Sequence, residues 1–210
     1  MVVGFPDSVI VTPTLREELE KSGNVSCVVD QGLHLVYCNP AWDQFALSNG
    51  GDGAVSSRVT GTSLLNVVPE ALKSLYDQLF AVARDTRLMW PLDYECSSAN
   101  LYRLYRMEIR PVQPAGFVLV HALRVERPHG SDRTIFSPNE NRYSDSRGLI
   151  IMCAHCRKTR RVSEPETWDW VPEYVRFDAP RRRITHGLCG PCTAYFYPQF
   201  GKVKAAASNR

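Results

Sequence analysis

Apolar and polar residues follow two rhythms in the first part of the chain, and each rhythm predicts a different element. Val25–Asp30 and Leu33–Cys38 are short runs rich in β-branched and aromatic residues. Because Gln31-Gly32 between them is a turn signal, a β-hairpin is expected. In Ala71–Arg84 the apolar residues instead recur every three or four positions, which is typical of a helix with one packed face.

Shorter helices are indicated by their end signals. Thr14–Ser22 is bounded by a proline and a glycine, which favour a helix start and a helix end. Asn39 is suited to cap a further helix whose first turn holds Pro40. Thr62–Val68 predicts a short helix, whereas the Gly- and Ser-rich stretch Asn49–Thr60 predicts a loop.

Three strand-like segments follow the long helix, at Leu88–Tyr94, Tyr102–Val112 and Phe117–Val125. In the first two segments, bulky apolar or aromatic side chains alternate with other side chains, and the third segment is strongly apolar. Two strands, several helices and a three-strand meander predict an α+β domain. We expect a five-stranded antiparallel sheet with helices on one face.

A change in composition divides the chain. Pro128–Arg147 is rich in Ser, Asn, Asp, Arg and Pro and shows little apolar periodicity, so it is predicted to be a linker. From Leu149 to Arg210 eleven Lys and Arg stand against five Asp and Glu, whereas acidic residues are in excess before Leu149. The predicted organisation is a first domain at 14–127, a linker at 128–148, a small module at 149–200 and a flexible tail at 201–210.

Four of the seven cysteines form two C-x-x-C pairs, Cys153/Cys156 and Cys189/Cys192. Two residues between cysteines allow one tight turn to present both sulfurs to one ion, and two such turns provide the tetrahedral sulfur shell that Zn²⁺ prefers. Four thiolates leave no open position for water, so the predicted zinc is structural.

Other interpretations of these cysteines stay open. His186 lies three residues before Cys189 and is suited either to replace one sulfur or to support the site from outside the shell, while His155 is expected to point away. A redox-active pair is the alternative to a metal, although the βαβ setting of a thioredoxin-like motif is missing.

The remaining cysteines, Cys27, Cys38 and Cys96, are scattered among apolar residues and are predicted to be small buried side chains without a basic neighbour. An odd cysteine count fits a reducing compartment better than a disulfide framework. With no secretory signal and no apolar run long enough for a transmembrane helix, a cytoplasmic location without membrane contact is expected.

The first domain resembles the PAS sensor domains. The resemblance covers Val25–Arg127 and rests on the phrases VVDQGLHLVYCNPAWDQFA, GTSLLNVVPE and GFVLVHALRVER. In that family Asn39 to Trp42 correspond to the motif that opens the helix after the second strand. One departure is that Leu123-Arg124-Val125 stand where the family often has Asp-Ile-Thr, so coupling to a following coiled coil is not implied.

The last part also has a likeness. The string MCAHCRKTRRV, a following Trp and THGLCGPC resemble a zinc-finger-like segment that occurs after PAS or receiver domains in bacterial signalling proteins. The resemblance spans Ile151–Tyr197. It implies a metal role for the four paired cysteines and a structural role for Trp168 or Trp170 and for His186.

PAS domains often hold a small molecule, but neither common cofactor is predicted here. Haem needs an axial His on or near the long helix, and that helix has none. The flavin-binding light sensors need a Cys in an Asn-Cys-Arg context, which is absent. Four residues are weak candidates for a pocket lining, although the favoured interpretation is that they fill the core: Trp90, Tyr94, Tyr105 and Met107.

No phosphate-binding glycine loop, metalloprotease motif or nucleophile elbow is present, so a non-enzymatic protein is predicted. We expect a bacterial-type sensory or regulatory protein whose zinc module contacts a protein partner. A ligand in the PAS-like domain and a homodimer stay open. The alternative is a nucleic-acid-binding regulator that uses the basic clusters Arg157–Arg161 and Arg181–Arg183.

Overall fold

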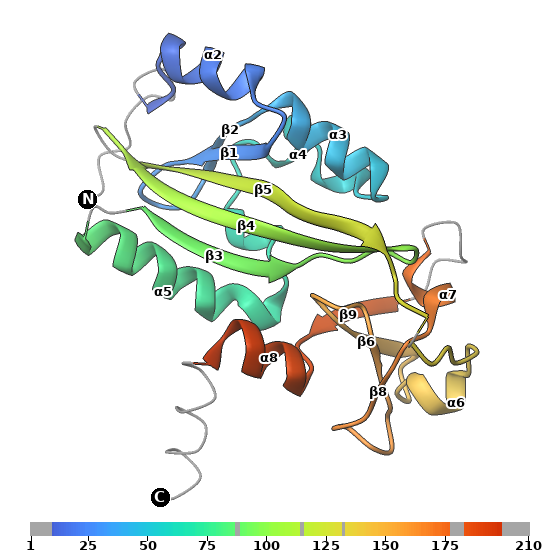
Figure 1. The fold of residues 1–210 in the computed structure, drawn as a ribbon. Coiled ribbons are helices and arrows are strands. Elements are labelled where there is room, and N and C mark those ends of the chain that lie inside the picture. Colours follow the sequence, from blue (N-terminus) through green and yellow to red (C-terminus); the bar gives the residue numbers. More distant parts are fainter. Residues whose placement is uncertain (1–9, 87–88, 114–115, 132, 177–182, 199–210) are drawn as a thin grey trace, which may run out of the picture. The chain divides into compact units, whose positions relative to one another are not determined.

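The computed structural model describes residues 10–86, 89–113, 116–131, 133–176 and 183–198, so the predicted tail at 201–210 lies outside the described residues (Figure 1). The contacts divide the chain into two compact units. The N-terminal unit comprises residues 1–92 and 105–124, and the C-terminal unit comprises residues 93–104 and 125–210.

A five-stranded antiparallel sheet is built from the segments that the sequence indicates as strands, which confirms the predicted α+β class. The strand order is β2-β1-β5-β4-β3, so the first hairpin pairs with the last strand of the meander. In that pairing Val28 of β1 lies opposite Val118 of β5. The strands are β1 (Val25–Val29), β2 (Leu35–Cys38), β3 (Trp90–Glu95), β4 (Leu101–Val112) and β5 (Gly116–Pro128).

The helices of the N-terminal unit also follow the predicted order, with two differences. The helix predicted at 62–68 is shorter, because only Leu64–Asn66 forms a 3₁₀ turn. The stretch predicted as a loop at 49–60 contains a 3₁₀ turn at Asp52–Ala54 and the one-turn helix α4 (Ser56–Val59), so that prediction is wrong. Asp43 explains the difference, because its carboxylate accepts hydrogen bonds from the Ser56 backbone N–H and hydroxyl and so fixes the first turn of α4. The other helices are α2 (Pro13–Lys21), α3 (Pro40–Ser48) and α5 (Glu70–Thr86).

Helices cover both faces of this sheet, and the prediction of helices on one face is wrong. Phe117 of β5 packs edge-to-face with Phe80 of α5. Val118 and Val120, whose side chains point to the opposite face, share a core cluster with Leu19 of α2. The physical reason is that β5 begins with five buried residues in a row, so each of its faces requires a cover.

Asn39 organises the entry to α3, as its sequence position predicts. Its side-chain oxygen accepts hydrogen bonds from the backbone N–H of Trp42, which caps the helix, and of Ser26 on β1. Its amide group donates to the carbonyls of Leu19 and Asn24. The side chain is fully buried, so these bonds replace those that water would make.

The C-terminal unit is built on a small mixed sheet of order β8-β7-β6-β9, in which β6 and β9 are parallel. The stretch predicted as a linker contributes the one-turn helix α6 (Glu140–Tyr143), whose Tyr143 is buried in a core with Trp170 and Tyr174. The other elements are β6 (Leu149–Cys153), β7 (Thr159–Arg160), β8 (Trp168–Asp169), α7 (Pro172–Val175), β9 (Arg183–Gly187) and α8 (Gly190–Phe196).

Within the described residues, no helix is both long and apolar enough to cross a bilayer.

Candidate metal centre

The two C-x-x-C pairs meet in the C-terminal unit. Cys153 ends β6, Cys156 closes the turn after it, Cys189 immediately precedes α8, and Cys192 lies in the first turn of that helix. The four Sγ atoms lie within 4.8 Å of one another, and all four side chains are buried. The residues could therefore hold one metal ion.

The sulfur spacing fits a metal and does not fit a disulfide. The Sγ atoms of Cys156 and Cys189 are 3.7 Å apart, and all four cysteines are free thiols. A tetrahedral zinc site with Zn–S distances of about 2.3 Å has sulfur–sulfur edges of about 3.8 Å. A disulfide would need about 2.05 Å.

The electrostatics of the cluster also favour a cation. Hydrogen bonds from neighbouring thiols lower the pKa of Cys153, and the same sharing of protons raises the pKa of Cys156 and Cys192. The pKa of Cys189 is lowered as well, so two sulfurs ionise readily, while their negative charge opposes ionisation of Cys156 and Cys192. A divalent cation at the centre would offset that repulsion and allow all four to bind as thiolates.

The parallel pairing of β6 with β9 explains how cysteines on either side of a thirty-two-residue spacer come together. Cys153 on β6 lies in register with Gly187 on β9, two residues before Cys189. The Ala154 N–H donates to the Gly187 carbonyl, which continues the pairing into the cysteine turn. The spacer holds β7, β8 and α7, as expected for an excursion longer than that of common zinc ribbons.

Arg157 adopts a left-handed backbone conformation (φ 61°) directly after Cys156 and makes an unexpected set of contacts. Its Nε donates to the Ser97 carbonyl, its Nη2 lies 3.7 Å from the Sγ of Cys96, and its Nη1 lies 3.2 Å from Nε2 of His186. The sequence showed no basic neighbour for Cys96, because Arg157 is sixty-one positions away.

His186 is engaged outside the sulfur cluster. Its Nε2 faces the Arg157 guanidinium, and burial together with that charge lowers the pKa of His186 to about 4. The ring is thus neutral at pH 7 and accepts a hydrogen bond from Arg157. This arrangement supports four sulfurs as the ligand set, with His186 held in a supporting position.

The turn between Cys153 and Cys156 is anchored through His155, whose side chain points away from the sulfurs. Nδ1 of His155 lies 2.8 Å from the Glu95 carbonyl, and Nε2 contacts the Tyr197 hydroxyl. The Ser97 N–H in turn approaches the His155 carbonyl. Glu95 ends β3, and Ser97 lies in the connection from β3 to β4. Sequence reasoning missed their contribution because they are some sixty positions from the turn.

Aromatic and apolar side chains cover the sulfurs. Trp168, Leu188 and Phe196 pack against the four cysteines, whereas Trp170 belongs to the neighbouring core around Tyr143. Of the two tryptophans suggested by the resemblance, Trp168 is therefore the one beside the centre.

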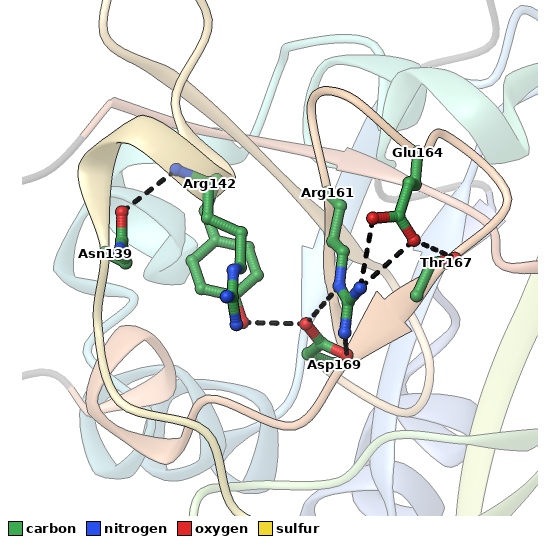
Figure 2. Close-up of polar contacts among 7 residues, drawn as sticks. Asn139, Arg142, Arg161, Glu164, Thr167 and Asp169 are labelled. Carbon is green, nitrogen blue, oxygen red and sulfur yellow. Dashed lines mark hydrogen bonds and ion pairs between the residues drawn. The ribbon is translucent and has the colours of Figure 1, made fainter.

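A charged network holds β8 against the rest of the unit (Figure 2). Asp169 is buried and accepts hydrogen bonds from Arg161 and from the Tyr143 hydroxyl. Arg161 also pairs with Glu164, whose carboxylate accepts a bond from Thr167. In the same view the Asn139 side chain caps α6 by accepting a hydrogen bond from the Arg142 backbone N–H.

The basic cluster Arg157–Arg161 is less available than its sequence suggests. Arg157 is directed to Ser97 and His186, and Arg161 is bound to Asp169 and Glu164, so Lys158 and Arg160 are the members without such partners in the described part of the chain. Arg181 and Arg182 of the second cluster lie outside the described residues.

The four weak pocket candidates are not brought together as one set. Tyr105 and Met107 are buried on β4 in the N-terminal unit, where Tyr105 packs edge-to-face with Phe45. Tyr94 belongs to the C-terminal unit, with its ring 6.0 Å from that of His155. The side chain of Trp90 lies outside the described part of the structure.

No family model matches the chain, and no curated protein matches it. Solved structures do match, and they include PAS domains, as the sequence resemblance predicted. The PAS domain of BvgS from Bordetella pertussis is 17% identical, with 54% of this chain and 86% of that chain covered and a TM-score of 0.44.

Two further structures show the same level of similarity. The photoactive yellow protein domain of the sensor histidine kinase Ppr from Rhodospirillum centenum is 13% identical, with 52% of this chain and 92% of that chain covered and a TM-score of 0.40. The PAS domain of nitrogen regulation protein NR(II) from Vibrio parahaemolyticus is 15% identical, with 56% of this chain and all of that chain covered and a TM-score of 0.34. This similarity concerns fold alone.

Proposed function

We propose that Cys153, Cys156, Cys189 and Cys192 bind one structural zinc ion, and that this centre holds together a module through which a PAS-like regulatory protein contacts a protein partner. The observation that carries the proposal is the buried sulfur cluster, whose atoms all lie within 4.8 Å of one another. A shell of four thiolates suits Zn²⁺ better than oxygen-preferring cations such as Mg²⁺ or Ca²⁺.

The centre has a structural role in this proposal because its surroundings leave no place for a reacting group. The sulfurs are buried beneath Trp168 and Phe196, and the nearby His155 and His186 already have polar partners. A catalytic zinc keeps a position open for water. The protein is accordingly proposed to be non-enzymatic and to act in the cytoplasm by binding, with the PAS-like unit sensing a ligand or mediating dimerisation.

A protein partner is favoured over nucleic acid because two of the basic residues next to the first cysteine pair are already paired inside the unit. Arg161 is neutralised by Asp169 and Glu164, and Arg157 is directed to Ser97 and His186. Phosphate binding depends on basic side chains that are free to release counterions.

Native mass spectrometry of protein purified without added metal tests the metal proposal. We expect one zinc ion per chain, lost in Cys153→Ser and in Cys189→Ser but retained in Cys96→Ser, which removes a thiol outside the cluster. Zinc-free wild-type protein, or equal zinc content in the three variants, would contradict it.

The partner proposal has its own test. Zinc-loaded protein and the Cys153→Ser variant are compared as baits by cross-linking in an extract of the native host, followed by mass spectrometry. We expect a defined protein to be enriched by the zinc-loaded bait alone. Identical captured proteins with both baits, or instead a steeply salt-dependent binding of a DNA or RNA pool, would overturn it.

A further inference from the structure

The cover over the cysteine cluster is incomplete on one side. An open cavity of about 880 Å³ within the C-terminal unit is lined by Cys156, Cys189 and Cys192, and Cys153 is not among its lining residues. The exposed fractions agree with this arrangement, because Cys156 and Cys192 are 7% and 6% exposed, whereas Cys153 has no exposed surface. A molecule of a few atoms in the cavity can therefore approach three of the four cysteines, and Cys153 is shielded from it.

Cys156 and Cys189 lie close enough to form a disulfide after a small movement. They belong to different turns, one after β6 and one directly before α8, and their Sγ atoms are 3.7 Å apart. A disulfide bond is about 2.05 Å long. Because Cys189 is only 2% exposed, a reagent in the cavity meets Cys156 first, and Cys189 is placed behind it as the thiol that completes the bond.

The small opening restricts which oxidant can react. None of the four cysteines is more than 7% exposed, and Trp168, Leu188 and Phe196 pack against them. Hydrogen peroxide is small enough to reach a sulfur through such an opening. A bulky disulfide such as oxidised glutathione must bring its own sulfur–sulfur bond into line with the attacking thiolate, so limited access slows its reaction.

We propose that hydrogen peroxide releases zinc from the metal centre by converting Cys156 and Cys189 to a disulfide. The Cys156 thiolate attacks one peroxide oxygen and the O–O bond breaks, which leaves a sulfenic acid on Cys156 and releases hydroxide. The Cys189 thiolate then attacks the Cys156 sulfur, so that the S–S bond forms and a second hydroxide leaves. Two protons from the solvent convert both hydroxides to water, and the two electrons lost by the sulfurs reduce the peroxide.

The disulfide leaves too few sulfurs to hold the ion. Cys153 and Cys192 remain as thiolates, whereas a structural zinc site has four protein ligands. A disulfide is reversible, so a thiol reductant together with zinc restores the centre. The inference rests on the proposed function, since the ion that peroxide releases is the structural zinc proposed above.

The test treats zinc-loaded full-length protein with one equivalent of hydrogen peroxide and follows zinc with a chromogenic chelator. We expect the loss of one zinc ion and two free thiols per chain, and peptide mapping after acid quenching should find Cys156 joined to Cys189. The matched control is Cys96→Ser, which removes a partly exposed thiol outside the cluster and should release zinc at the wild-type rate. Glutathione disulfide at the same concentration should release zinc at least about ten-fold more slowly than peroxide.

The zinc content of the reduced protein is measured first, so that a failed switch is distinguished from a failed metal centre. With one zinc ion per chain at the start, three results would overturn the switch and leave the metal centre standing: zinc retained after peroxide, a disulfide other than Cys156–Cys189, or equally fast release by glutathione disulfide. Reduced protein without zinc would instead contradict the metal centre and the switch together.

Discussion

Asp169 is a buried carboxylate whose charge is balanced within the C-terminal unit. Burial alone would raise the pKa of Asp169, but the hydrogen bonds from Arg161 and Tyr143 and the Arg161 charge outweigh burial and lower it. The pKa in the folded protein is thus below that of the unfolded chain. The stability that this carboxylate contributes is fully present when the pH is above its pKa in the unfolded chain. It is lost as the pH falls through its pKa in the folded protein.

Replacing this carboxylate should remove both the stability and its pH dependence. Asp169→Asn leaves the Arg161 guanidinium without its main partner and should lower the free energy of unfolding at pH 7 by about 2–3 kcal/mol. The difference from wild type should shrink as the pH falls below about 4. Urea unfolding followed at several pH values measures both effects, with Glu164→Gln, which alters the exposed partner of Arg161, as the control. A constant difference between pH 7 and pH 3 would contradict this assignment.

Asn39 has the corresponding role in the N-terminal unit. Asn39→Ala removes the cap of α3 and leaves the Ser26 N–H and two carbonyls with fewer partners, so we expect a loss of about 2–4 kcal/mol in unfolding free energy. Thr12→Ala removes an exposed helix cap from α2 and should cost about 1 kcal/mol. Thermal unfolding followed by circular dichroism compares the two, and equal losses would show that the buried network adds nothing.

Residues whose role depends on local chemistry were predictable from the sequence. The helix cap at Asn39 and the metal-binding potential of the two C-x-x-C pairs follow from side-chain type and spacing alone. The contacts of Arg157 were not predictable in this way. His186 becomes its neighbour through the pairing of β6 with β9, and Ser97 belongs to a connection some sixty positions away in the sequence. The left-handed backbone of Arg157 is also not indicated by its residue type.

At the level of elements, the end of β3 and its connection to β4 extend the support of the metal centre. The Glu95 carbonyl holds His155, and the Ser97 carbonyl holds Arg157, on either side of Cys156. These contacts fix the shape of the first cysteine turn, in the way that groups around a metal site commonly orient its ligands. The module predicted at 149–200 therefore depends on residues far outside that range.

Arg157→Ala should loosen the metal centre without removing a ligand. We expect one zinc ion per chain to remain bound, with zinc affinity lowered about ten-fold because the cysteine turn is less well ordered. Competition with a chromogenic chelator measures the affinity, and Arg160→Ala is the matched control. Unchanged affinity in Arg157→Ala would show that the contact with Ser97 and His186 has no part in holding the site.

The elements themselves were largely predictable, because strands and helices longer than one turn have a periodic pattern in the sequence. The hairpin β1–β2, the helix α5 and the meander β3–β5 all appear in the predicted order. Two kinds of feature were not predictable. The cover on the second face of the sheet depends on tertiary packing of α2, and the parallel pairing of β6 with β9 joins short segments without a pattern of their own.

Across the whole molecule, each of the two units contains its own hydrophobic core. The four cysteines form a further buried cluster, which belongs to the C-terminal unit. Loss of zinc should therefore destabilise the C-terminal unit and leave the sheet of the N-terminal unit folded. Hydrogen–deuterium exchange of Cys153→Ser should show faster exchange in β6 and α8 and unchanged exchange in β1 and β5, with Cys96→Ser as the control. Equal loss of protection in both units would contradict this separation.

X-ray absorption spectroscopy at the zinc edge of the full-length protein tests the four-sulfur zinc centre. We expect one zinc ion per chain with four sulfur neighbours at about 2.3 Å and no coordinating nitrogen or oxygen. A shell with an imidazole nitrogen would place His186 among the ligands and contradict the four-sulfur assignment. An absence of bound zinc, or a water oxygen at an open position, would contradict the structural centre itself.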